Sequence, residues 1–204
     1  MAIITIPSGL WVDQFTWGQV NYGLTFASGD TGVQQTRVLA PPRWTATLAI
    51  GGKLRAAEAA KWKAFVLQLR GKINQAALYD LKQSTLVGTM AGSPVLTTAV
   101  AVGDTTFAIT TTAGATVAQG DKIQLGTGAT RQLFIATATA TANGAGAMSL
   151  TVEPPSRYVQ TLGSAVVYSQ PTALFRLDNN ANDWSATPNA EGNFSLSFTE
   201  SWES

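Results

Sequence analysis

The tryptophans of this chain stand in two blocks that are far apart in the sequence. Four lie in the first third and two near the end of the 204 residues, and none falls between residues 63 and 183. Large aromatic side chains usually belong to a hydrophobic core. We therefore expect the two ends of the chain to share one core, with the middle inserted into it. The six are Trp11, Trp17, Trp44, Trp62, Trp184 and Trp202.

The middle of the chain also differs in composition from its two ends. Residues 88–170 contain six charged residues and consist mainly of Ala, Thr, Gly and Val. Gly and Pro residues typical of loops stand at both edges of this segment. These changes predict a first domain made of residues 1–86 plus 171–204 and an inserted domain at residues 87–170.

Two periodicities indicate a mainly β fold with one helix. Residues 43–50 alternate polar and apolar side chains, which is the period of a half-buried strand, and Pro41-Pro42 bars a helix before them. Apolar residues then recur at helical spacing, and Gly71 follows where a C-terminal cap belongs. We expect a helix over residues 54–70 that packs on the sheet through its apolar stripe.

The middle segment is predicted to be all-β. Short apolar alternations are separated by turn residues, and Asn143-Gly144 is a common hairpin dipeptide. The pattern predicts a hairpin in which Leu133 and Ile135 face Met148, Leu150 and Val152. A segment of about 80 residues can form a small barrel or sandwich.

The chain contains no histidine and no cysteine. This excludes disulfides, thiol nucleophiles and histidine acid–base catalysis, and with them most serine and cysteine hydrolases and most transition-metal enzymes. Carboxylates remain, but Glu200 and Glu203 stand in no recognisable glycosidase setting. The Asx residues from Asp178 to Asp183 lack the Gly and Glu of a calcium loop. We expect no enzyme and no catalytic, cofactor or metal site, and a glycosidase is the least favoured hypothesis.

Charge is segregated along the chain in a way that suggests a contact between copies. A basic set lies on or beside the predicted helix, and an acidic set lies in the C-terminal segment. Two different patches that attract one another form a heterologous contact, and such contacts can close into rings. A solvated helix face and a DNA phosphate backbone are the alternatives for the basic set. The basic set is Lys53, Arg55, Lys61, Lys63, Arg70 and Lys72, and the acidic set is Asp178, Asp183, Glu191, Glu200 and Glu203.

With these segments placed, the chain resembles the distal tail proteins, which are structural proteins at the tail tip of long-tailed, siphovirus-like bacteriophages. The similarity lies in packing patterns rather than in catalytic signatures, and it covers most of the chain from residue 43 to residue 178. It is carried by residues 43–48, 59–65, 69–71, 78–80, 118–125, 150–155 and 175–177.

The resemblance implies a belt-like β-sandwich or split barrel with one helix. It also implies assembly as a ring, usually a hexamer, between the tail tube and the host-recognition hub, with DNA passing through the lumen. Expected partners are further copies of the chain, the tail tube protein and the hub or baseplate proteins. The expected location is the virion tail tip after synthesis in the bacterial cytoplasm, without membrane insertion.

A carbohydrate- or cell-surface-binding decoration module of the tail is the alternative function. Glycan sites usually present an aromatic platform at the surface. The middle segment offers four aromatic side chains for such a platform, namely Phe107, Phe134, Tyr158 and Tyr168.

Overall fold

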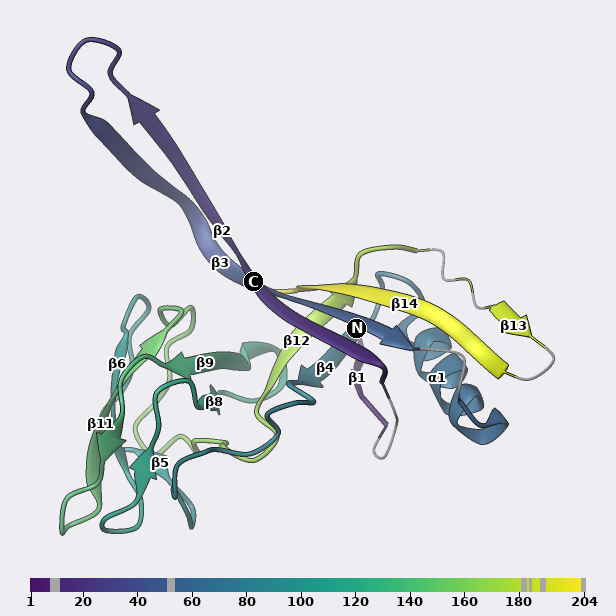
Figure 1. Cartoon of the computed structure of the whole chain (residues 1–204). Helices are drawn as coiled ribbons and strands as arrows, with labels where there is room; N and C mark the ends of the chain where they lie inside the picture. The colour runs from purple at the N-terminus through teal and green to yellow at the C-terminus, as the bar shows by residue number, and fades with distance from the viewer. Residues whose placement is uncertain (8–11, 51–53, 181–182, 184, 188–189, 203–204) are drawn as a thin grey trace.

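The computed structural model describes residues 1–7, 12–50, 54–180, 183, 185–187 and 190–202, with 185–187 and 190–194 described by their backbone alone. Within this part of the chain the fold is mainly β with one α-helix and a curled, partly closed arrangement of sheets (Figure 1). The predicted fold class, a β-sandwich or split barrel with one helix and a small all-β insertion, is confirmed.

Strands from both ends of the chain form the first sheet, in the order β1-β4-β12-β14-β3-β2, with β13 paired to β14. The pairs in this sheet are antiparallel except β1–β4. Trp17 of β2 contacts Phe175 of β12 with ring centroids 5.2 Å apart, so aromatic residues from the two ends share one core as expected. The strands are β1 (Ile3–Thr5), β2 (Gln14–Ala27), β3 (Gln34–Ile50), β4 (Gln75–Tyr79), β12 (Thr172–Leu177), β13 (Ser185–Thr187) and β14 (Ala190–Glu200).

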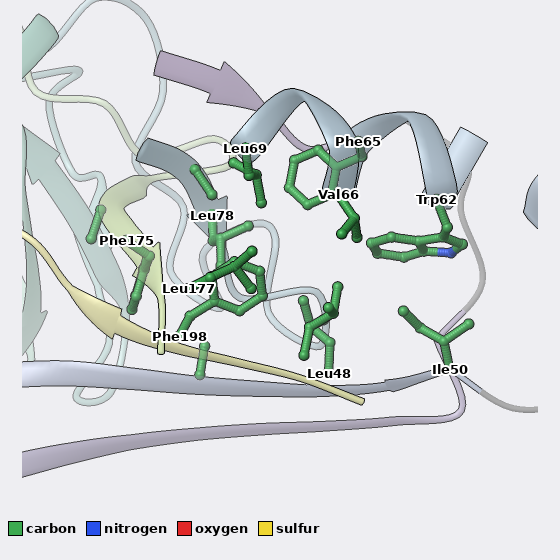
Figure 2. Close-up of a cluster of buried hydrophobic side chains, with 14 of the residues drawn as sticks. Leu48, Ile50, Trp62, Phe65, Val66, Leu69, Leu78, Phe175, Leu177 and Phe198 are labelled. Carbon is green, nitrogen blue, oxygen red and sulfur yellow. The ribbon is translucent and has the colours of Figure 1, made fainter. Parts of the chain in front are cut away.

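The helix α1 (Ala56–Leu69) covers one face of this sheet. Its first turn is closed by Glu58, whose carboxylate accepts a hydrogen bond from the Arg55 backbone N–H. It ends where Arg70 and Gly71 take positive φ angles of 50° and 64°, a conformation typical of helix C-termini. Figure 2 shows its apolar stripe pointing toward the sheet side chains. The buried stripe is Ala59, Trp62, Phe65, Val66 and Leu69.

The middle segment forms a five-stranded sheet in the order β5-β6-β11-β9-β8, with a separate β7–β10 pair. It encloses a second cluster of buried apolar residues around Phe107 and Phe134. Whether the domain boundaries fall at residues 86/87 and 170/171 stays a prediction. The elements are β5 (Val95–Leu96), β6 (Thr106–Thr110), β7 (Thr116–Val117), β8 (Lys122–Leu125), a 3-10 turn (Gly128–Thr130), β9 (Gln132–Ala136), β10 (Ala140–Thr141) and β11 (Ala147–Glu153).

The predicted hairpin around Asn143-Gly144 is wrong, because it pairs β11 with β9 along its length. Strand β11 pairs with β6 over residues 147–151 and meets β9 only at its last two residues. The reason lies in β9, where Leu133 and Phe134 are both fully buried but in different clusters. Successive side chains of a strand point to opposite faces. Strand β9 is thus covered on both faces, which apolar alternation alone does not reveal.

The β2–β3 hairpin extends far beyond the sheet that it starts from. Strand β14 pairs with β3 only at residues 45–50, whereas β2 and β3 stay paired out to Ala27 and Gln34. The distal half therefore projects from the molecule as a two-stranded ribbon (Figure 1). We call residues 20–40 the arm and residues 26–33 its tip.

Candidate assembly surfaces

The solvent-facing side of α1 and the turn after it carry the basic set predicted from the sequence. Arg55, Lys61, Arg70 and Lys72 are exposed, and Lys63 is half-buried. Because the apolar stripe of α1 faces the sheet, the other positions are left to solvent. Lys53 lies outside the described residues. The role of this basic face in a contact between copies stays a prediction.

The C-terminal acids do not all lie on a surface. Asp178 and Asp183 are exposed, Glu191 is described by its backbone in β14, and Glu203 lies outside the described residues. Glu200 is only 2% exposed, so its expected place on a contact surface is wrong. Along β14, alternate side chains point inward, and Glu200 follows Leu196 and Phe198 on the buried face.

The basic and acidic sets also approach each other within one copy of the chain. The backbone N–H of Lys72 donates a hydrogen bond to Asn180 Oδ1 at 3.2 Å, which places the end of the helix beside the segment that follows Asp178. The end of the helix and this segment are therefore neighbours within one subunit, through a backbone N–H and a neutral amide. The sequence does not signal this contact, because 108 positions separate its two residues.

Glu200 is the centre of a buried ion pair that joins the middle segment to the first sheet. Its two carboxylate oxygens accept hydrogen bonds from both terminal nitrogens of Arg157. Oε2 also accepts a hydrogen bond from the backbone N–H of Trp44 at 3.0 Å. The guanidiniums of Arg157 and Arg43 each lie 4.3 Å from the ring centroid of Trp202, which is cation–π distance. We call the Glu200–Arg157 pair the clamp, because it holds the middle segment to the first sheet.

Two further buried groups fasten β8 and β9 to the first sheet. Lys122 Nζ forms an ion pair with Asp80, and the Trp44 indole N–H donates to the Leu133 carbonyl at 3.2 Å. Arg131 donates to Thr172 Oγ1 at 2.9 Å, and burial lowers the pKa of its guanidinium from the ordinary value. The described parts of the first sheet and the middle segment are therefore held together by polar contacts as well as by apolar packing.

The arm is the surface that sequence reasoning missed. Every residue from Gln19 to Leu39 is exposed, although many are large and apolar. Paired residues of an antiparallel ladder share a face, so Tyr22, Leu24 and Phe26 form an apolar row on one face of the arm. The alternation of these three residues was visible in the sequence, but it indicates only a strand with one apolar face. The exposed apolar residues are Val20, Tyr22, Leu24, Phe26, Val33, Val38 and Leu39.

A groove of about 700 Å³ lies where the base of the arm meets the middle segment. One wall is Val38 to Pro42 of β3, and the other comes from the loops at Val102 and at Pro155–Tyr158. Trp202 also lines it, held by its contacts with the two guanidiniums. The lining is mostly apolar and is built from segments far apart in the sequence.

The aromatic side chains considered for glycan binding are placed unequally. Phe107 and Phe134 are buried in the core of the middle segment, with ring centroids 4.9 Å apart. Tyr158 and Tyr168 are half-buried, and only Tyr158 lines the groove. Two of the four aromatics are therefore unavailable for a surface platform.

The described residues hold no group of three or more acidic side chains placed to bind a metal ion. Among the described residues, no helix is both long enough and apolar enough to cross a membrane. Comparison with models of protein families finds no match, and neither does comparison with curated protein sequences. The arm, the groove and the helix face are thus the features that bear on function.

Proposed function

We propose that this chain is a structural virion protein that forms a ring at the tail tip of a long-tailed bacteriophage. In this role it links the tail tube to the host-recognition hub and leaves a lumen for DNA, and six is the expected number of copies. The proposal draws on the resemblance of residues 43–178 to distal tail proteins. It draws equally on an arm whose apolar side chains have no cover within the subunit.

The arm is the observation that carries self-association. Seven large apolar side chains, between 38% and 74% exposed, present on the order of 500 Å² of apolar surface, divided between the two faces of the ribbon. The largest apolar patch on an ordinary monomer is roughly 300–600 Å², and a stable interface takes roughly 800 Å² from each partner. The arm alone therefore offers a large part of one side of an interface.

The shape of the arm favours a ring over a two-fold dimer. It projects from one end of the first sheet, whereas α1 lies toward the other end (Figure 1). Contacts that join two different surfaces are heterologous, and they form a closed ring when the rotation between neighbours closes. Each contact can then be modest, because closure makes every subunit bind two neighbours.

Mass photometry and native mass spectrometry of the full chain test this function. We expect one predominant species whose mass is a fixed multiple of 21.4 kDa. A variant with Tyr22→Ser and Leu24→Ser should shift the population toward monomer. Leu162→Ser is the matched control, because Leu162 is 66% exposed but lies in the middle segment, outside the arm, the groove lining and the basic helix face. A chain that stays monomeric at high concentration and with its tail partners present would exclude the function.

A further inference from the structure

Two apolar surfaces of this chain lack cover within the subunit, and they lie at opposite ends of the arm. The tip exposes Phe26 at 59% and Val33 at 58%. The groove at the base is lined by apolar side chains that include Val38, Val102 and Trp202. Both surfaces are apolar, and a contact between them would remove apolar area from water, which is favourable.

The tip of one copy cannot fill the groove of the same copy. The groove is walled by Val38 to Pro42, which belong to the arm's own base. Along β3, Gln34 lies four residues beyond Val38 and eight beyond Pro42, or roughly 13 to 26 Å at the rise of a β-strand. Figure 1 shows the hairpin running outward without turning back. Any tip that occupies the groove therefore comes from another molecule.

The charges beside the two surfaces are also complementary. The tip, residues 26–33, carries one charged residue, Asp30, while Arg37 lies further down the arm opposite Leu24. The groove is bordered by Arg157 and, through the ring of Trp202, by Arg43, with Glu200 as the acid that pairs with Arg157. This border carries one more positive than negative charge among these groups. An acidic tip is attracted to such a border, and a basic tip would be repelled.

We propose that the tip of the arm seats in the groove of a second copy of this chain. Phe26 and Val33 contact the apolar lining, and Asp30 faces the side that carries Arg43. This inference rests on the proposed ring, and it names the contact that repeats around it. Because tip and groove are different surfaces, each copy offers one and receives one, which is the pattern of a heterologous interface.

Pairwise cysteine cross-linking tests the contact directly, because the chain has no cysteine of its own. Phe26→Cys reports the tip, and Val102→Cys reports the groove at a loop position that is 64% exposed. The double variant, oxidised after assembly, should give a ladder of covalent oligomers on a non-reducing gel. A mixture of the two single variants should stop at covalent dimers. Disulfides form only when the two Cβ atoms come within about 4.5 Å, so the result is specific.

The matched control combines Phe26→Cys with Leu162→Cys, which is exposed to a similar degree at 66% but lies outside the groove lining and the helix face. It should give no ladder. Phe26→Asp should weaken assembly about tenfold or more, as expected for a central apolar anchor, while leaving the melting temperature of the dilute protein unchanged.

Three results would overturn the docking. Assembly of the wild-type chain without any Phe26–Val102 cross-link would show that another contact forms the ring, and the proposed function would stand. Cross-linking of the Phe26→Cys single variant to itself would indicate tip-to-tip pairing instead. A wild-type chain that never assembles would remove the ring and, with it, this contact.

Discussion

The two halves of the β2–β3 hairpin have the same sequence pattern and very different surroundings. At the base, Leu48 and Ile50 are essentially fully buried beneath α1 (Figure 2). In the arm, Leu24 and Phe26 also alternate with small or polar residues but are 43% and 59% exposed. An alternation of apolar and polar residues therefore identifies the apolar face of a strand, but it does not indicate whether another element covers that face. In this chain a helix covers one half, and the other half is exposed.

The two halves also differ in what stabilises them. The base gains its stability from apolar burial in a layered core, whereas a two-stranded ribbon in water is marginal by itself. The arm is held mainly by its backbone ladder and by its continuity with the base. Local stability should therefore fall from base to tip, and a partner that covers the arm should restore it.

Truncating one leucine in each half is the strongest test of this comparison. Leu48→Ala should lower the free energy of unfolding by about 4 kcal/mol, since it leaves a cavity in the core. Leu24→Ala should change it by less than about 0.5 kcal/mol, because that side chain is largely in water. Urea denaturation of the dilute, unassembled protein measures both. Similar losses for the two variants would mean that the arm is packed within the subunit.

Removing the clamp at the point where base becomes arm has the next largest expected effect. Glu200→Gln should lower the free energy of unfolding by about 3 kcal/mol, because Arg157 then stays buried without its counter-charge. The double variant Arg157→Met with Glu200→Leu should regain much of that loss. Thermal unfolding of both variants checks the pair. If the double variant loses as much free energy of unfolding as Glu200→Gln does, an uncompensated charge is not the cause of the loss.

Amide hydrogen exchange should resolve the gradient along the hairpin. In dilute protein, amides of residues 22–27 should exchange about 100-fold faster than amides of residues 45–49, which lie between two other strands. At concentrations where the chain assembles, protection of the arm should rise while that of the base stays the same. Uniform protection in the dilute protein would contradict the distinction between the halves.

Charge reversal on the helix face should have the smallest effect on folding. Lys61→Glu with Lys72→Glu, both at exposed positions of the basic set, should change the free energy of unfolding by less than about 0.5 kcal/mol, since surface charges contribute little. We expect weaker assembly, measured by mass photometry at low and at high salt. Assembly that is unchanged at both would assign these residues to a solvated face and leave the apolar arm as the main contact.

Several features could be predicted from the residues, and the reasons they could are local. The helix follows from the spacing of Trp62, Phe65 and Leu69, and its end follows from Gly71. The shared core follows from the tryptophan blocks. Strand β9 could not be placed correctly, because the burial of both Leu133 and Phe134 depends on two separate clusters.

The candidate surfaces were predictable only in part. The basic helix face was visible, because a helix with one apolar stripe leaves its other positions to solvent. Glu200 was misplaced among the surface acids, since its partner Arg157 lies 43 positions away. The groove was invisible for the same reason, as its walls come from β3, two loops of the middle segment and Trp202.

The sequence by itself determined the period of each segment, the absence of histidine and cysteine chemistry, and the division of the chain into aromatic ends and a weakly charged middle. These are properties of neighbouring residues and of composition. The tertiary structure alone decided which apolar faces are covered, because cover comes from residues far along the chain. Trp44 meets Leu133 across 89 positions, while Phe26, on the same hairpin as Trp44, meets water.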